Sequence, residues 1–179
     1  MAKEPQLPTP PPPAPPGGSG NAADQPLFHV EKVYLKDFSF ENPNTPEVFQ
    51  VTKEPKVEFN LETGSTRKGE HHYEVTLHVT TEVKLEERTM FLVDVTYAGL
   101  FLVRNVPEQH VPLLLGVDCP GILFPYLRQV VSSTITEGGF KPLVLDPINF
   151  AALYQQQART RQPQQDQGAT RGPSGEPVQ

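Results

Sequence analysis

Residues 72–85 read HYEVTLHVTTEVKL, in which apolar and polar side chains alternate almost without interruption. Because side chains point alternately to the two faces of a pleated strand, this stretch predicts one long strand with an apolar face and a polar face. A second strand, expected over residues 91–97 after the polar turn 86–89, is apolar on both sides. A sheet with such a strand needs cover on both faces, and a partner surface is the natural cover for part of the second face.

Two more strands are expected upstream, over residues 28–41 and 57–61. The first of them carries apolar residues on both sides, and the glycine-containing segment 63–71 is expected to be a loop. With a strand over 91–103, the sheet has four strands whose connections are too short to hold crossover helices. The sequence therefore predicts an antiparallel sheet.

Two helices are expected after the last strand. Residues 119–139 place apolar side chains near one stripe, contain Pro125 and finish at two glycines, which predicts a helix with a C-terminal stop. Asp146, which a proline follows, predicts the N-cap of a final helix. Strands followed by helices favour an α+β fold, in which a four-stranded antiparallel sheet carries two helices packed on one face.

Composition divides the chain into three parts. Residues 1–27 hold 9 of the 21 prolines, and residues 156–179 are rich in Gln, Gly and Pro, so both are expected to be disordered. Residues 28–155 form the expected domain and contain 11 Lys and Arg against 17 Asp and Glu, a net charge of −6. An acidic domain without a basic cluster argues against a nucleic-acid partner.

The expected location is the cytoplasm. Cys119 is the only cysteine, which excludes an internal disulfide and favours a reducing compartment. The N-terminus lacks the pattern of a signal peptide, and no stretch approaches the ~18 apolar residues that a membrane span needs. We therefore expect a soluble protein with no direct membrane insertion.

No catalytic constellation is expected. Glu70, His71 and His72 invite a metal site, but adjacent histidines on an extended segment point to opposite sides, which favours a solvated loop. Cys119 has no nearby base in the sequence and is expected to be a small buried filler. The sequence also has no glycine-rich phosphate loop and no nucleophile elbow. We expect neither an enzyme nor a cofactor or metal.

Two features remain open from the residues alone. The run Pro10–Pro13 favours a spacer over a ligand for a polyproline-binding domain. Asp37, Glu41 and Asp94 lie on predicted strands that also carry apolar residues, which fits a hydrated sheet face or a docking surface equally well.

Six segments of the chain resemble the SecB family of bacterial protein-export chaperones. They are YLKDFSFENPN at 34–44, VFQ at 48–50, YEV at 73–75, FLVDV at 91–95, PGILFPY at 120–126 and PINFAAL at 147–153. They occur in the family's order and together span essentially all of residues 28–155. The resemblance implies a chaperone that binds unfolded precursor proteins without ATP and delivers them to SecA, the export motor.

The resemblance also implies an assembly and three sets of residues. SecB-like chains form a tetramer, a dimer of dimers in which helices lie between two sheets. The SecA-docking set, which would meet a basic, zinc-containing tail of SecA, comprises Asp37, Glu41, Leu92 and Asp94. The client-binding set comprises Phe49, Val57, Phe59, Leu61, Phe150, Leu153 and Tyr154. The tetramer-interface set comprises Val93, Val95 and Tyr97.

Two alternatives remain beside the export chaperone. One is a SecB-like chaperone of a toxin–antitoxin system, which would use the same apolar grooves for one antitoxin. The other is a carrier of a small apolar ligand, which predicts a closed cavity and no affinity for unfolded chains. The chain also departs from many relatives because it has no tryptophan in the segment after Gln50.

Overall fold

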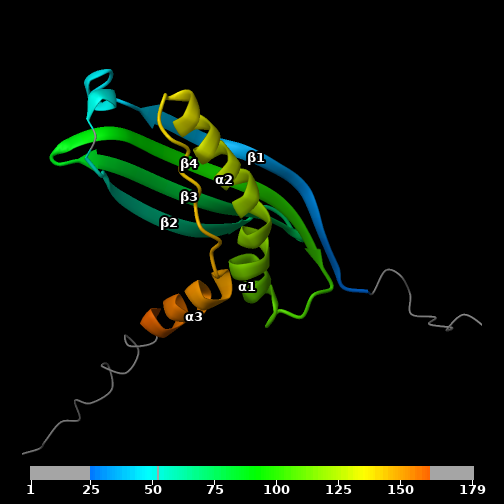
Figure 1. Cartoon of the computed structure of the whole chain (residues 1–179). Helices are drawn as coiled ribbons and strands as arrows, with labels where there is room; N and C mark the ends of the chain where they lie inside the picture. Colours follow the sequence, from blue (N-terminus) through cyan, green and yellow to red (C-terminus); the bar gives the residue numbers. More distant parts are fainter. Residues whose placement is uncertain (1–24, 52, 162–179) are drawn as a thin grey trace, which may run out of the picture.

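A computed structural model describes residues 25–51 and 53–161, so the predicted disorder of residues 1–24 and 162–179 lies outside the described residues. One sheet forms the centre, with strand order β1-β4-β3-β2 and antiparallel pairing throughout (Figure 1). The strands are β1 (Leu27–Glu41), β2 (Lys56–Arg67), β3 (His72–Leu85) and β4 (Arg88–Arg104). The predicted antiparallel α+β architecture is confirmed.

The edge strand β2 is longer than the sequence indicates. Gly64 lies inside it rather than in a loop, and only a short hairpin connects it to β3. The Arg67 side chain holds this hairpin by donating hydrogen bonds to the carbonyl oxygens of Gly69 (2.9 Å) and Glu70 (2.6 Å). The expected loop over 63–71 is therefore wrong for its first half: Gly64 continues the strand opposite Thr76, whose hydroxyl oxygen would lie 2.7 Å from a Cβ at this position.

The edge strand β1 contains two bulges, at Glu31 and at Lys36, where the pairing with β4 shifts by one residue. Each bulge adds one residue and so exchanges the faces of all residues that follow it. As a result Val33 and Leu35 lie on the same face as Phe38. Most apolar residues of this strand therefore share one face, and the prediction that places Val33 and Leu35 opposite Phe38 is wrong, although Tyr34 lies on the other face.

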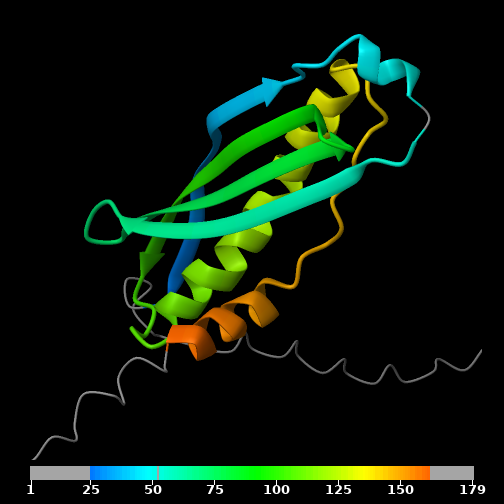
Figure 2. The same ribbon diagram turned by 90° about the vertical axis from the view of Figure 1, so that its left-hand side faces the viewer.

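One long helix covers the sheet and begins earlier than predicted. It runs without a break through α1 (Val111–Leu113), the π-helical segment η2 (Leu114–Asp118) and α2 (Cys119–Glu137), as Figure 2 shows. The side chains at every fourth position of α2 are fully buried against β3 and β4: Leu123, Leu127, Val131 and Ile135. The stop at Gly138 and Gly139 is confirmed, since Gly139 adopts a positive φ of 84° and both amides bond back into the last turn.

The helix over Val111–Glu137 is also long and apolar enough to cross a membrane by length and composition, which the sequence analysis did not expect. Only 28% of its most apolar window is buried in this chain. Its stripe of buried residues packs on the sheet. The remaining apolar surface of the helix is open to another layer.

The last helix, α3 (Phe150–Arg161), begins later than predicted and continues past the expected domain end at residue 155. Asn149 caps it: its side-chain oxygen accepts a hydrogen bond of 3.0 Å from the Ala152 amide. The prediction of Asp146 as N-cap is wrong. The helix packs against η2, where the Tyr154 ring lies over Gly116 so closely that a Cβ there would be 2.5 Å from the ring.

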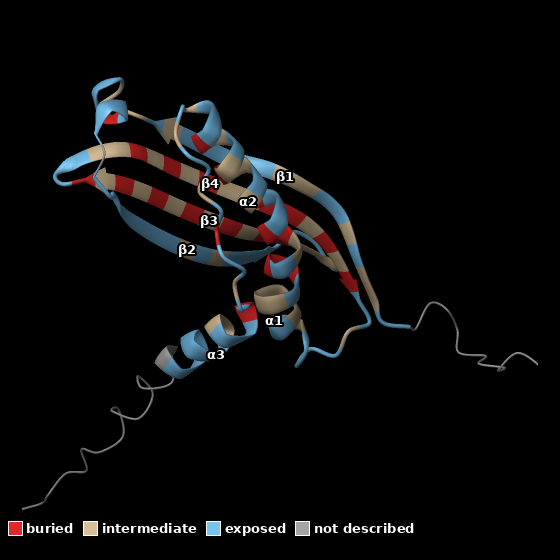
Figure 3. Ribbon diagram, in the orientation of Figure 1, coloured by how far each residue is buried: buried red, intermediate tan, exposed pale blue. Residues whose placement is uncertain are grey.

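The core lies between the sheet and the long helix. The face of the sheet that α2 covers is called the inner face here, and the opposite one the outer face. Buried and less buried residues alternate along most of β3, as the sequence predicts, and along most of β4, which was expected to be apolar on both sides (Figure 3). Thr81 is the exception on the inner face: it has 0% exposure, and its hydroxyl has no hydrogen-bond partner among the described residues.

Candidate functional site

The outer face carries all four residues of the predicted SecA-docking set. Register pairs Asp37 with Thr96, Ser39 with Asp94 and Glu41 with Leu92, and directly paired residues point to the same side. The bulge at Lys36 is what turns Asp37 outward. The structure thus brings together on two neighbouring strands the following residues: Asp37, Glu41, Leu92 and Asp94.

Asp94 has a defined hydrogen-bonding environment on this face. Thr80 on β3 donates a hydrogen bond of 2.8 Å to its Oδ2 atom, and His78 Nε2 lies 3.0 Å from both carboxylate oxygens. On its other side, His78 Nδ1 is 3.9 Å from Glu62 of β2. Both His78 and Asp94 keep 34% side-chain exposure, so a partner can reach them.

The two halves of the outer face differ in charge balance. On β2 and β3, Lys84 pairs with Glu82 at 2.9 Å and Lys56 pairs with Glu58 at 2.8 Å. Among the described residues, neither Asp37 nor Glu41 forms an ion pair. Asp37 and Glu41 therefore keep negative charge that no ion pair among the described residues compensates, which would favour a basic partner.

A buried carboxylate organises the part of the outer face next to the Lys36 bulge. Glu74 is only 7% exposed, and its Oε1 atom accepts hydrogen bonds from Lys36 (2.8 Å) and from the Tyr34 hydroxyl (2.5 Å). Lys68 lies 3.2 Å from Oε2. The bond from Lys36, and then that from Tyr34, lower the pKa of Glu74 to about 2. The same carboxylate raises the pKa of Tyr34 to about 12.

An apolar groove of about 740 Å³ opens on the inner side, at the end of the sheet where β1 ends and β2 begins. Phe49, on the short helix η1 (Glu47–Gln50), packs against Phe140 with ring centroids 5.0 Å apart, and Phe140 packs against Phe91 at 4.7 Å. Phe49 remains 49% exposed and Val57 46% exposed. This groove therefore offers aromatic and aliphatic surface that the chain itself leaves open.

Three of the predicted client-binding residues form one row on β2. Val57, Phe59 and Leu61 pair with inner-face residues of β3, and the contacts of β2 with the long helix are mainly with η2 rather than with α2. Phe59 is 45% exposed, and Leu61 is partly buried against the core. The row leads from the groove at Val57 to a hollow of about 450 Å³ at Thr63, which Tyr154 of α3 also lines.

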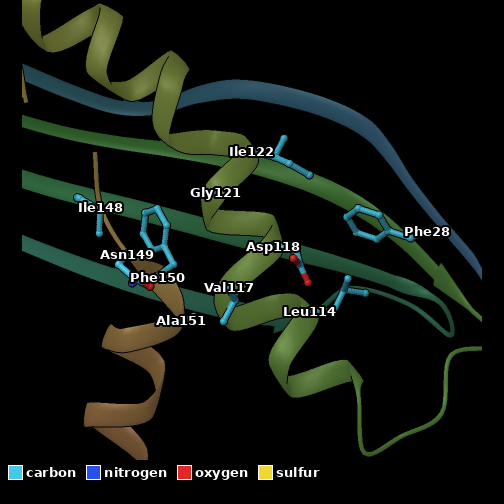
Figure 4. Close-up of a pocket in the computed structure, with 10 residues that line it drawn as sticks. All are labelled: Phe28, Leu114, Val117, Asp118, Gly121, Ile122, Ile148, Asn149, Phe150 and Ala151. Carbon is cyan, nitrogen blue, oxygen red and sulfur yellow. The ribbon is translucent and has the colours of Figure 1, made fainter. Parts of the chain in front are cut away.

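Phe150 does not belong to this open surface. It is 6% exposed and makes an edge-on contact with Phe124 of α2, with ring centroids 5.9 Å apart. Leu153 is half-buried and packs against the same core. Figure 4 shows Phe150 beside Ile148 in a hollow of about 720 Å³ between α3 and the start of the long helix. Its assignment to client binding is corrected to anchoring α3.

The predicted tetramer-interface residues also divide into buried and partly accessible ones. Val93 and Val95 face the helical layer as expected, but both have 0% exposure, so α2 of the same chain already covers them. Tyr97 is half-buried and stacks on Tyr126 of α2, with centroids 6.0 Å apart. Tyr126 is 47% exposed and offers the accessible part of this layer.

Several residues of the groove are not marked by any pattern in the sequence. Met90, Phe140 and Leu143 line it, and two of them come from the segment between α2 and α3, which no periodic pattern marks. A phenylalanine directly after the helix stop was the available signal. Cys119 is buried as expected, and burial raises the pKa of its thiol to about 12, which leaves it unreactive.

A four-stranded antiparallel sheet covered by one long helix, with carboxylates on its other face, can be compared with known protein families. The family model described as preprotein translocase subunit SecB matches residues 21–161. The chain belongs to the SecB family, whose members are chaperones of protein export rather than enzymes.

Named relatives agree over most of the chain. The protein-export protein SecB of Magnetococcus marinus is 55% identical over 148 residues, which is 82% of this chain and 94% of that protein. SecB of Neisseria meningitidis serogroup C is 51% identical, covering 74% of this chain and 91% of its own. SecB of Thiobacillus denitrificans is 45% identical, covering 79% and 93%.

A solved structure supports the fold. A SecB-like chaperone of Mycobacterium tuberculosis, in complex with a peptide from the HigA1 antitoxin, superposes with a TM-score of 0.57. It is 13% identical and covers 68% of this chain and 90% of its own. At this identity the likeness concerns the fold alone.

Proposed function

We propose that this chain captures unfolded precursor proteins without ATP through the open apolar surface of its inner side. The observation that carries the proposal is the row of Val57, Phe59 and Leu61 on the edge strand β2, in which Val57 and Phe59 are exposed and which continues the aromatic groove at Phe49. Such a surface binds by burial of apolar area, at about 25 cal/mol per Å², and does not depend on one client shape. Tyr154 extends this surface at its far end.

Delivery to SecA is proposed to use the outer face, so that a captured client and the motor occupy opposite sides of the sheet. The uncompensated carboxylates Asp37 and Glu41 suit a basic partner segment, and Leu92 between the acidic positions adds an apolar contact. The docking set is thus proposed to remain accessible while the grooves are filled.

Assembly into a dimer of dimers in the cytoplasm is proposed as well. This proposal is supported by the long helix, because only 28% of its most apolar window is buried in the single chain. Tyr126, together with Tyr97 beneath it, is the accessible apolar part of this helical layer.

Two rival functions have less support. The toxin–antitoxin chaperone that shares the fold is 13% identical, whereas the relatives named for protein export reach 45–55%. A small-ligand carrier predicts an enclosed cavity, but the groove is lined by side chains as exposed as Phe49.

The test is client capture by a variant with a polar groove. Phe49→Ser with Val57→Ser removes two large exposed apolar contacts, and we expect about tenfold weaker binding of a permanently unfolded client. Val144→Ser is the matched control, since Val144 is 56% exposed but lies outside the groove. Binding is measured by light scattering after size exclusion and by fluorescence anisotropy. Equal affinity of the groove variant and the control contradicts the proposal.

A further inference from the structure

His78 lies on the outer face of the sheet between two acidic side chains. It stands on β3, diagonal to Asp94 of β4 and directly opposite Glu62 of β2. Its Nε2 atom is 3.0 Å from both oxygens of Asp94, while its Nδ1 atom is 3.9 Å from a Glu62 oxygen. The imidazole is therefore held between two carboxylates on a surface that a partner can reach.

We propose that His78 is a positioning residue for Asp94 and that protonation of His78 weakens docking of the basic partner. This inference rests on the proposed docking function of the outer face. The neutral imidazole orients the Asp94 carboxylate by a hydrogen bond, and Thr80 donates a second hydrogen bond of 2.8 Å to the Oδ2 atom. The protonated imidazole instead forms an ion pair with Asp94 and competes for it with the partner's lysine or arginine.

The charged groups around His78 determine how its protonation affects docking. The titratable groups that face it are Asp94 on β4, Glu62 on β2 and, one strand further along the same row, Asp37 on β1. All three are acidic, and the helices cover the opposite face of the sheet. Proton uptake by His78 thus removes net negative charge from the centre of the docking face. Histidine is the side chain that ordinarily changes charge between about pH 5 and 8.

The experiment compares docking of purified SecA to the wild type and to His78→Gln at pH 8.0 and pH 5.5, by calorimetry with the full chain. We expect the affinity of the wild type to fall about two- to fivefold more than that of His78→Gln, as for one exposed ion pair. His78→Lys, which carries a fixed charge, is expected to bind weakly at both pH values. His29→Gln is the matched control, since His29 is exposed on the same face far from Asp94 along β1.

A second readout follows protons directly. At pH 6.5 docking should release protons from the wild type, which appears as a difference in heat between phosphate and Tris buffers, and His78→Gln should release fewer. Parallel pH profiles and equal proton release in the wild type and His78→Gln overturn the role of His78 alone. Unchanged docking of Asp94→Asn at pH 8.0 overturns the proposed docking set itself. The two failures are therefore distinguishable.

Discussion

Substitution of Glu74 tests the electrostatics of the outer face quantitatively. The pKa of Glu74 is about 2 in the folded chain, against an ordinary value of 4.5. Since one pKa unit corresponds to 1.36 kcal/mol, this difference sets an upper bound of about 3 kcal/mol on the stabilisation by the ionised carboxylate. The side chains of Lys36 and Lys68 are 42% and 48% exposed, so solvent screens much of this value. We expect Glu74→Gln to cost about 1–2 kcal/mol at pH 7.

The pH dependence of this cost has a defined sign. Because the folded pKa lies below the unfolded one, the stabilisation is fully present above about pH 4.5 and is lost as the pH falls towards about 2. The raised pKa of Tyr34 reports the same hydrogen bond, so it adds no separate contribution. The difference in stability between the wild type and Glu74→Gln should therefore shrink as the solution is acidified.

The assay is urea unfolding of both proteins at equal chain concentration, at intervals between pH 7 and pH 2.5. Comparison at each pH cancels the acid destabilisation that other carboxylates cause in both proteins. A difference between the two proteins that stays constant from pH 7 to pH 2.5 would refute the ionic account of this cluster. No difference at pH 7 would refute it as well.

Four further variants test the docking face, the assembly and the core. Asp37→Lys with Glu41→Lys should weaken SecA binding at least tenfold in calorimetry while client capture is kept, because opposite charges steer docking. Tyr126→Glu should reduce the mass in sedimentation from about four times to about twice 19.9 kDa, since a charge on an apolar contact is costly. Thr81→Val should raise the free energy of unfolding by about 1 kcal/mol, as it removes a buried hydroxyl without a partner among the described residues. Gly99→Ala should lower it by about 1–3 kcal/mol in urea unfolding, since the added Cβ would lie 2.6 Å from the Phe101 ring and 2.9 Å from Leu123.

Each of these variants has an outcome that contradicts its reasoning. For the docking face, Glu108→Lys with Glu137→Lys makes the same change in net charge at exposed positions elsewhere, and an equal loss of SecA binding would mean that only net charge matters. An unchanged mass of Tyr126→Glu would remove this side chain from the interface. A less stable Thr81→Val would mean that the hydroxyl has a partner in the assembled protein, and a Gly99→Ala chain as stable as the wild type would mean that the Phe101 ring moves aside.

The central sheet was predictable because β3 and β4 pair regularly around Leu92 and Asp94. Residues that alternate in the sequence there also alternate between the two faces of the sheet. This regularity placed Leu92 and Asp94 on the outer face correctly. Strand β1 was less predictable, because its two bulges fall at residues whose type does not indicate a bulge. Its trace was the change of apolar positions from even numbers at Val30 to odd at Val33 and back at Phe38.

The helices were less predictable than the sheet. The long helix contains Gly116 and Pro120, which argue against helix in a local pattern, yet packing on the sheet and the π-helical segment accommodate both. Asp146 with its proline satisfied the rules for a helix start, but Asn149 makes the actual cap. Phe150 was misassigned because an apolar stripe does not reveal whether its own chain or a client covers it.

The two bulges of β1 also determine where this strand tolerates a change of length. Deletion of Glu31 or Lys36 would straighten the strand and leave every later side chain on its present face. Deletion of a regularly paired residue such as Val33 would instead turn the following residues over, up to the next bulge. Insertions and deletions among homologous first strands should therefore gather at these two positions, because only there can the chain lose a residue and keep its acidic surface.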